Sequence, residues 1–141
     1  SRLLQLIALN VGQRDPVIRS GRMTFHLGGD TLWIDLLELP SEEVTVRAHG
    51  TLRRDGGVRL RVVANPGGPG VLKKIPVLKE TTAGISRFLG WVQDRGLYVF
   101  RVEGTLRDPS VEAVRLFGLA NKDVKLYHHL IEGKPSEEAP E

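Results

Sequence analysis

The sequence contains no cysteine, which excludes disulfide bonds, thiolate nucleophiles and cysteine-ligated metal sites. It also lacks any apolar run that approaches the roughly 20 residues of a membrane-spanning helix. Neither sign of charge dominates, because 20 basic residues are scattered among 17 acidic ones, whereas nucleic-acid-binding proteins usually gather basic residues on one face. These absences predict a globular chain that carries no transmembrane segment and does not bind nucleic acid.

Residue patterns that are typical of catalysis are missing as well. No serine stands in the Gly-x-Ser-x-Gly setting of a nucleophile elbow. The loop at residues 65–70 is rich in glycine and proline but lacks the Gly-Lys-Ser/Thr order of a phosphate-binding loop, which favours a flexible connector. His128 and His129 are adjacent and therefore point apart, so we expect polar surface there rather than metal ligands. The sequence predicts no catalytic residue, no metal site, no cofactor and no enzymatic activity.

What the sequence does contain is a series of alternating apolar and polar residues, the pattern of half-buried β-strands. Residues 21–28 alternate around Met23, Phe25 and Leu27, which predicts a strand with one buried face. Residues 31–39 predict a second strand with two opposed sets of side chains. One set is Leu32, Ile34 and Leu36, and the opposite set is Trp33, Asp35 and Leu37.

The clearest local signal is a β-hairpin that begins at residue 44. Two alternating runs flank Asp55-Gly56, a pair that is preferred in tight hairpin turns because both central positions need positive φ. One face of this hairpin is apolar and the other is polar. The apolar residues are Val44, Val46, Ala48, Val58, Leu60 and Val62. The polar residues are Arg47, His49, Arg59 and Arg61.

Helical spacing of apolar residues predicts two helices. One is amphipathic and covers about residues 80–95, with Thr81 or Thr82 as its N-cap and Gly96 just past its end. Its polar face mixes acidic and basic residues, which favours packing on the sheet over lying on a membrane. The other helix is short and is expected at residues 2–10.

The second half of the chain returns to strand at residues 97–106. Residues 110–116 fit either a short edge strand or a helix that is capped by Asp108. We therefore predict one α+β module, residues 1–131, built on a mainly antiparallel, curved sheet of about five or six strands. Residues 132–141 are rich in proline, glutamate and lysine, which predicts a disordered tail.

Several of these pieces follow one another in a distinctive order. They are a strand pair (21–39), an alternating run (44–50), a hairpin (51–64), a Pro/Gly loop (65–70) and a variable stretch (71–96). A strand then closes on the string Gly104-Thr105-Leu106-Arg107-Asp108-Pro109, the most specific element. This ordered set, over about residues 1–118, resembles the C-terminal region of the AsmA-like family, which is similar to the TamB-like bridge proteins of the bacterial envelope.

The resemblance implies a periplasmic protein that is anchored in the inner membrane and supports phospholipid transport or outer-membrane biogenesis. Phospholipid or envelope proteins would be its partners, and no cofactor is implied. The anchor is expected elsewhere in a longer protein, because this chain begins with Ser1 inside an apolar segment. The helical segment 78–95 is longer and more regular than the corresponding loop of the family, which predicts a capped or modified groove.

Two interpretations of the apolar hairpin face are open at this point. In an AsmA-like groove, its six residues line a surface for acyl chains, with each buried methylene worth roughly 0.8 kcal/mol. In the alternative, the helix at 78–95 packs on this face as a closed core. The module would then dock a partner protein through a sheet edge or through its polar face.

Overall fold

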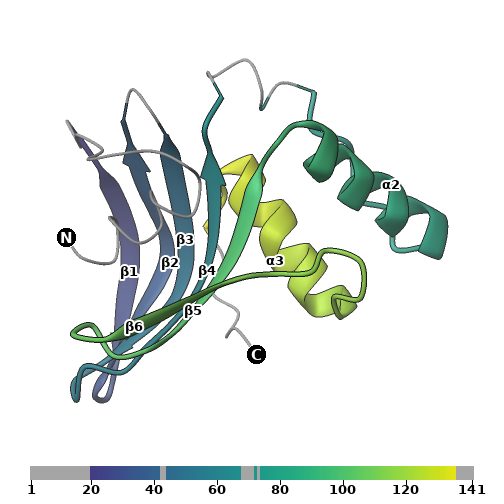
Figure 1. The fold of residues 1–141 in the computed structure, drawn as a ribbon. Helices are drawn as coiled ribbons and strands as arrows, with labels where there is room; N and C mark the ends of the chain where they lie inside the picture. Colours follow the sequence, from purple (N-terminus) through teal and green to yellow (C-terminus); the bar gives the residue numbers. More distant parts are fainter. Residues whose placement is uncertain (1–19, 42–43, 68–71, 73, 136–141) are drawn as a thin grey trace.

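The computed structural model describes residues 20–41, 44–67, 72 and 74–135, so the helix expected at residues 2–10 lies outside the described part of the chain. Within it, six strands and two helices follow one another (Figure 1). The strands are β1 (Arg22–Gly28), β2 (Thr31–Pro40), β3 (Thr45–Arg53), β4 (Val58–Asn65), β5 (Tyr98–Gly104) and β6 (Pro109–Ala113). The helices are α2 (Thr82–Asp94) and α3 (Asn121–Glu132).

The described strands form one antiparallel meander, in which each strand pairs with its neighbours along the chain. The predicted α+β fold with a mainly antiparallel sheet is therefore confirmed. The ambiguous segment 110–116 contributes a strand, because β6 runs to Ala113 and pairs with β5. In Figure 1 the strands bend along their length, and β1 forms the edge that lies farthest from α2.

The hairpin of β3 and β4 forms as predicted, but its turn differs from the expected one. The two strands pair in a single uninterrupted register. Of the turn residues only Gly56 has a positive φ, of 92°. The amide of Gly57 donates a hydrogen bond to the Asp55 carboxylate at 2.8 Å. Asp55 therefore stabilises the turn through its side chain and does not adopt the left-handed backbone that a tight two-residue turn requires.

β2 contains a bulge that changes which side chains share a face. Asp35 and Leu36 both lie opposite His49 of β3, because the register shifts there by one residue. One extra residue reverses the alternation beyond it. Leu36 consequently packs under the helices, whereas Leu37 packs on the other side of the sheet with Ile34. The predicted division, which placed Leu36 beside Ile34 and opposite Leu37, is wrong.

Helix α2 matches the predicted helix at both ends. Thr81 is its N-cap, and the hydroxyl oxygen of Thr81 accepts a hydrogen bond from the amide of Gly84 at 3.0 Å. Gly96, with a φ of 68°, follows the last turn. Phe88 and Val92 are buried and pack toward the sheet. The preference for sheet packing over a membrane-surface position is therefore confirmed.

Helix α3 is an element that the sequence analysis does not predict. Its apolar residues stand at helical spacing and bury one side of the helix. Gly133 ends the helix with a left-handed φ of 73°. The last residue of α3 is Glu132, where the predicted tail begins, and residues 136–141 lie outside the described part of the chain.

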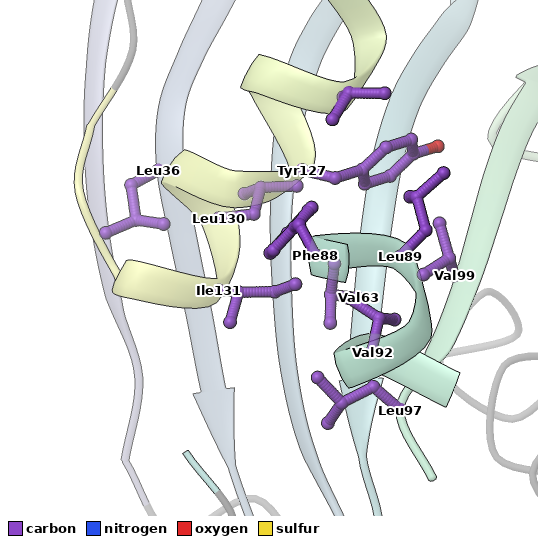
Figure 2. Packing of buried hydrophobic residues seen from close by; sticks show 11 residues of the cluster. Leu36, Val63, Phe88, Leu89, Val92, Leu97, Val99, Tyr127, Leu130 and Ile131 are labelled. Atoms are coloured by element: carbon purple, nitrogen blue, oxygen red, sulfur yellow. The ribbon is translucent and has the colours of Figure 1, made fainter. Parts of the chain in front are cut away.

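The sheet separates two apolar clusters. One lies on the helix-covered face, where Val63 and Val99 of the sheet meet Phe88 of α2 and Leu130 of α3 (Figure 2). The other lies on the opposite side and receives no residue from either described helix. We call this second surface the apolar face. Its buried residues are Ile34, Val44, Val46, Ala48, Val58, Leu60, Val62, Ala64, Phe100 and Val102.

Strand β1 is exposed along its whole length. Its three large apolar residues, Met23, Phe25 and Leu27, are 43%, 51% and 75% exposed. Their pairing with β2 places them on the same side of the sheet as the apolar face. The prediction that they form a buried face is wrong, because β1 is an edge strand that no described element covers.

Candidate functional site

The six apolar hairpin residues that the sequence singles out lie together on the apolar face, and none is more than 5% exposed. They are Val44, Val46, Ala48, Val58, Leu60 and Val62. β5 extends the cluster, because Phe100 lies opposite Val62 and Val102 lies opposite Leu60. Val111 of β6 packs against it at one margin. With the apolar residues of β1 at the other margin, the surface spans all six strands.

This surface is closed at its centre and open at one side. The central side chains contact one another and are already removed from water. The margin on β1 keeps Met23, Phe25 and Leu27 in solvent. A ligand that approaches from solution therefore meets β1 before it meets the central residues.

Helix α2 does not cover the apolar face. Its buried residues Phe88, Leu89 and Val92 pack with Val63 and Val99, whose side chains point to the other side of the sheet (Figure 2). The alternative in which this helix closes over the six hairpin residues is therefore wrong. The helix and the six residues lie on opposite sides of one sheet.

The polar face of the hairpin is the surface that α3 covers, so most of it does not face solvent. Arg61 is 1% exposed, and its Nε atom lies 3.6 Å from Oδ1 of Asp123 on α3. His49 is buried as well, and its Nδ1 atom lies 3.2 Å from the carbonyl oxygen of Asp35. Only Arg59 of this face is fully on the surface. The sequence analysis misses Asp123, the acid that faces Arg61.

Arg47 ties the end of α3 to the sheet. Its Nη1 atom donates a hydrogen bond to the carbonyl oxygen of Ile131 at 2.6 Å, and its Nε atom donates to Glu38 at 2.8 Å. The second bond, together with one from Arg22, holds Glu38 in its charged form. Burial alone would raise the pKa of Glu38, but the bonds and charges of Arg47 and Arg22 outweigh it and lower that pKa below its usual value.

Charged side chains gather at the centre of the α3 contact. Arg61 lies directly opposite Arg101 in the sheet, and Asp123 is the acid that faces Arg61. The Arg61–Asp123 contact is an ion pair without a hydrogen bond, since no hydrogen-bond partner within the described chain reaches Arg61 Nε or Asp123 Oδ1. Beside it, the hydroxyl of Tyr127 donates to the carbonyl oxygen of Phe100 at 3.1 Å, and burial raises the pKa of Tyr127.

The adjacent histidines of α3 differ in environment. His129 is exposed, as predicted. His128 is buried, with Nε2 3.0 Å from the carbonyl oxygen of Pro76 and Nδ1 2.9 Å from Glu132. The prediction of polar surface is therefore wrong for His128, which joins α3 to the segment before α2. In the described part of the chain, no three histidine or acidic side chains are placed to hold a metal ion.

The string at residues 104–109 forms the turn between β5 and β6. Gly104 has a φ of 93°, and a side chain there would meet the carbonyl oxygen of Asp108 at 2.9 Å. The hydroxyl oxygen of Thr105 accepts a hydrogen bond from the amide of Asp108 at 3.1 Å. The amide of Leu106 donates to the carbonyl oxygen of Gly56, which joins this turn to the β3–β4 hairpin. These contacts account for the string as a structural turn.

No family model, no curated protein and no solved structure matches the chain. Membership of the AsmA-like family therefore stays a prediction from the ordered pieces and the string at 104–109. Neither helix of the described part is long and apolar enough to cross a membrane.

Taken together, the two sides of the sheet differ in what they can do. The helix-covered face uses its charged side chains to hold α3 in place, so these residues are structural. The apolar face is built from aliphatic and aromatic residues and has one exposed margin. Such a surface can hold hydrocarbon without any polar contact.

Proposed function

We propose that this chain is a non-enzymatic module of a periplasmic, inner-membrane-anchored protein of the AsmA-like type. In this proposal it supports phospholipid transport or outer-membrane biogenesis by holding acyl chains against the apolar face. The observation that carries the proposal is the position of that face. It reaches from β1 to β6, while both described helices pack on the opposite side of the sheet.

The exposed margin on β1 is where binding gains most. The central residues are already buried, so covering them again removes no further apolar area from water. Phe25 and Leu27 are half or more exposed, and an acyl chain lying along β1 would cover both. Each methylene that leaves water contributes roughly 0.8 kcal/mol, so a contact of several methylenes suffices for reversible binding.

Site-specific photo-crosslinking in the full-length protein in cells tests this proposal. The probe replaces Phe25 in one variant and Thr24 in the other. Both positions are exposed and adjacent on β1, but Thr24 pairs with Leu36 and so lies on the opposite side of the sheet. We expect phospholipid adducts at Phe25 and none at Thr24. The absence of lipid at Phe25, or equal yields at both positions, would contradict the proposal.

One further position sharpens the experiment. A probe at Val62, which is fully buried, reports only a lipid that enters the centre of the apolar face.

A second candidate function is the docking of another envelope protein, and the exposed β1 edge favours it. A strand edge with free backbone groups is a common site for the addition of a partner strand. In the same experiment, adducts to another protein at both Thr24 and Phe25 without lipid would support docking over lipid binding.

A further inference from the structure

Strand β1 offers a sheet edge without the usual protection against pairing. Within the described chain it pairs only with β2, and no other described strand pairs with the backbone groups on its other side. Natural edge strands are commonly shortened, bulged, or supplied with lysine or proline. β1 has seven residues and contains neither lysine nor proline, and its two basic residues, Arg22 and His26, contact the acids Glu38 and Asp35 of β2. The extra residue of the β1–β2 bulge lies on β2, so β1 itself runs without interruption.

The opposite edge of the sheet contrasts with β1. β6 has only five residues and begins with Pro109, which is buried and has no amide to donate. The two edges therefore differ in their capacity to accept a strand.

We propose that β1 pairs with β1 of a second copy of this chain, antiparallel and around a twofold axis that passes through Phe25. In this register Phe25 lies opposite its own symmetry mate, and Met23 lies opposite Leu27. In this register odd-numbered residues lie opposite odd-numbered residues. The apolar side chains of Met23, Phe25 and Leu27 in both copies therefore point to the same side of the joined sheet. The three apolar side chains that β1 leaves in solvent then lie beside their counterparts on the same side of the joined sheet.

The charges of β1 agree with this register. Arg22 lies opposite Gly28, and His26 lies opposite Thr24, so no two basic side chains face each other. A shift to the register centred on Thr24 would place Arg22 opposite His26. Cross-strand pairs of like charge are destabilising, which favours the register centred on Phe25 whenever His26 is protonated.

Nothing in the described fold obstructs such a pair. In Figure 1 α2 lies at the far end of the sheet from β1, and α3 packs on β3 and β4. The twofold axis stands perpendicular to the sheet, so the apolar faces of both copies lie on the same side and become continuous. A single strand pair is a small interface, so the dimer is expected to be reversible and concentration-dependent.

Cysteine crosslinking tests the register, because the native chain has no cysteine of its own. Phe25→Cys is expected to form a covalent homodimer under mild oxidation or with a short thiol crosslinker. Thr24→Cys and His26→Cys are each expected to crosslink weakly alone and strongly when mixed, because these residues face each other across the pair. Ser86→Cys, on the exposed side of α2, is the control and should stay monomeric. Equal yields at all four positions would overturn the proposal.

The mass of the unmodified chain in solution provides an independent test. We expect sedimentation to show a dimer that dissociates on dilution over a roughly hundredfold concentration range. Phe25→Lys should raise its dissociation constant roughly tenfold or more, because two charges would meet at the axis. Leu106→Lys is the matched control, since Leu106 is 49% exposed on a turn outside β1.

A chain that is monomeric at every concentration, or a dimer that Phe25→Lys leaves unchanged, would overturn the proposal. Crosslinks from Phe25→Cys that join only other proteins would also overturn it and favour a foreign strand. These results do not depend on lipid, so the dimer and the proposed lipid function can fail separately.

Discussion

Replacing Asp123 by asparagine removes the acid that faces the buried guanidinium of Arg61. The two groups lie 3.6 Å apart, and Arg61 is 1% exposed. With an effective dielectric constant of about 20, two unit charges at this separation attract each other by roughly 4–5 kcal/mol. Arg101 also lies opposite Arg61 in the sheet, with Glu112 of β6 on the other side of Arg101. We expect the free energy of unfolding to fall by about 3–5 kcal/mol, the usual cost of leaving one charge of a buried pair alone.

Urea unfolding followed by circular dichroism measures this change. Asp94→Asn, at the exposed end of α2, is the matched control, since it makes the same chemical change on the surface. That control should shift the free energy of unfolding by no more than about 0.5 kcal/mol. The double variant Arg61→Met with Asp123→Leu should recover most of the loss, because no uncompensated charge then remains under α3.

Two results would refute this reasoning. If Asp123→Asn costs less than about 1 kcal/mol, the ion pair is not what holds Arg61 beneath the helix. If the double variant is as unstable as the single one, lost packing rather than an unpaired charge explains the effect.

Two further predictions concern α2 and the pH dependence of stability. Gly90→Ala should raise the free energy of unfolding by about 0.5–1 kcal/mol, because the added methyl group meets nothing. Gly84→Ala should lower it, because the same group would come too close to the carbonyl oxygen of Lys79. Urea midpoints that shift in the same direction for both variants would contradict this close approach. The pKa of Glu38 is lowered in the folded state, so its charge stabilises the fold above the unfolded-state pKa, and this contribution is lost as the pH falls through the folded-state pKa. The stability advantage of the native chain over Glu38→Gln, measured by thermal unfolding, should therefore shrink from about pH 7 to about pH 3, and an advantage that grows on acidification would be inconsistent with the lowered pKa.

Local signals in the sequence predicted the elements that depend on local chemistry. The Thr81 cap and the left-handed glycine at position 96 mark both ends of α2. Asp55-Gly56 marks the hairpin, even though the turn uses the aspartate side chain rather than its backbone. In each case the residues that determine the element lie within a few positions of it.

Helix α3 could have been found by the same means. Val124, Tyr127, Leu130 and Ile131 recur at helical spacing, and Gly133 is a typical helix stop. The partners of Arg47 and Arg61 lie on α3, so the burial of these residues could not be predicted before this helix was known.

Other features depend on contacts between distant residues. The β2 bulge exchanges the faces of Leu36 and Leu37. The alternation of apolar and polar residues does not reveal that a strand contains one extra residue. The burial of Arg61 depends on Asp123, which lies on another element. The exposure of Phe25 follows from the position of β1 at the sheet edge, although its alternation is the same as that of a covered strand.

The place of α3 in the chain has a consequence for the order of folding. All six strands precede this helix in the chain, yet Arg47 and Arg61 find their α3 partners only there. The meander can form strand by strand from neighbouring segments, which is a fast route. Final desolvation of the basic side of the sheet requires α3, so the strands can pair before that side is removed from water.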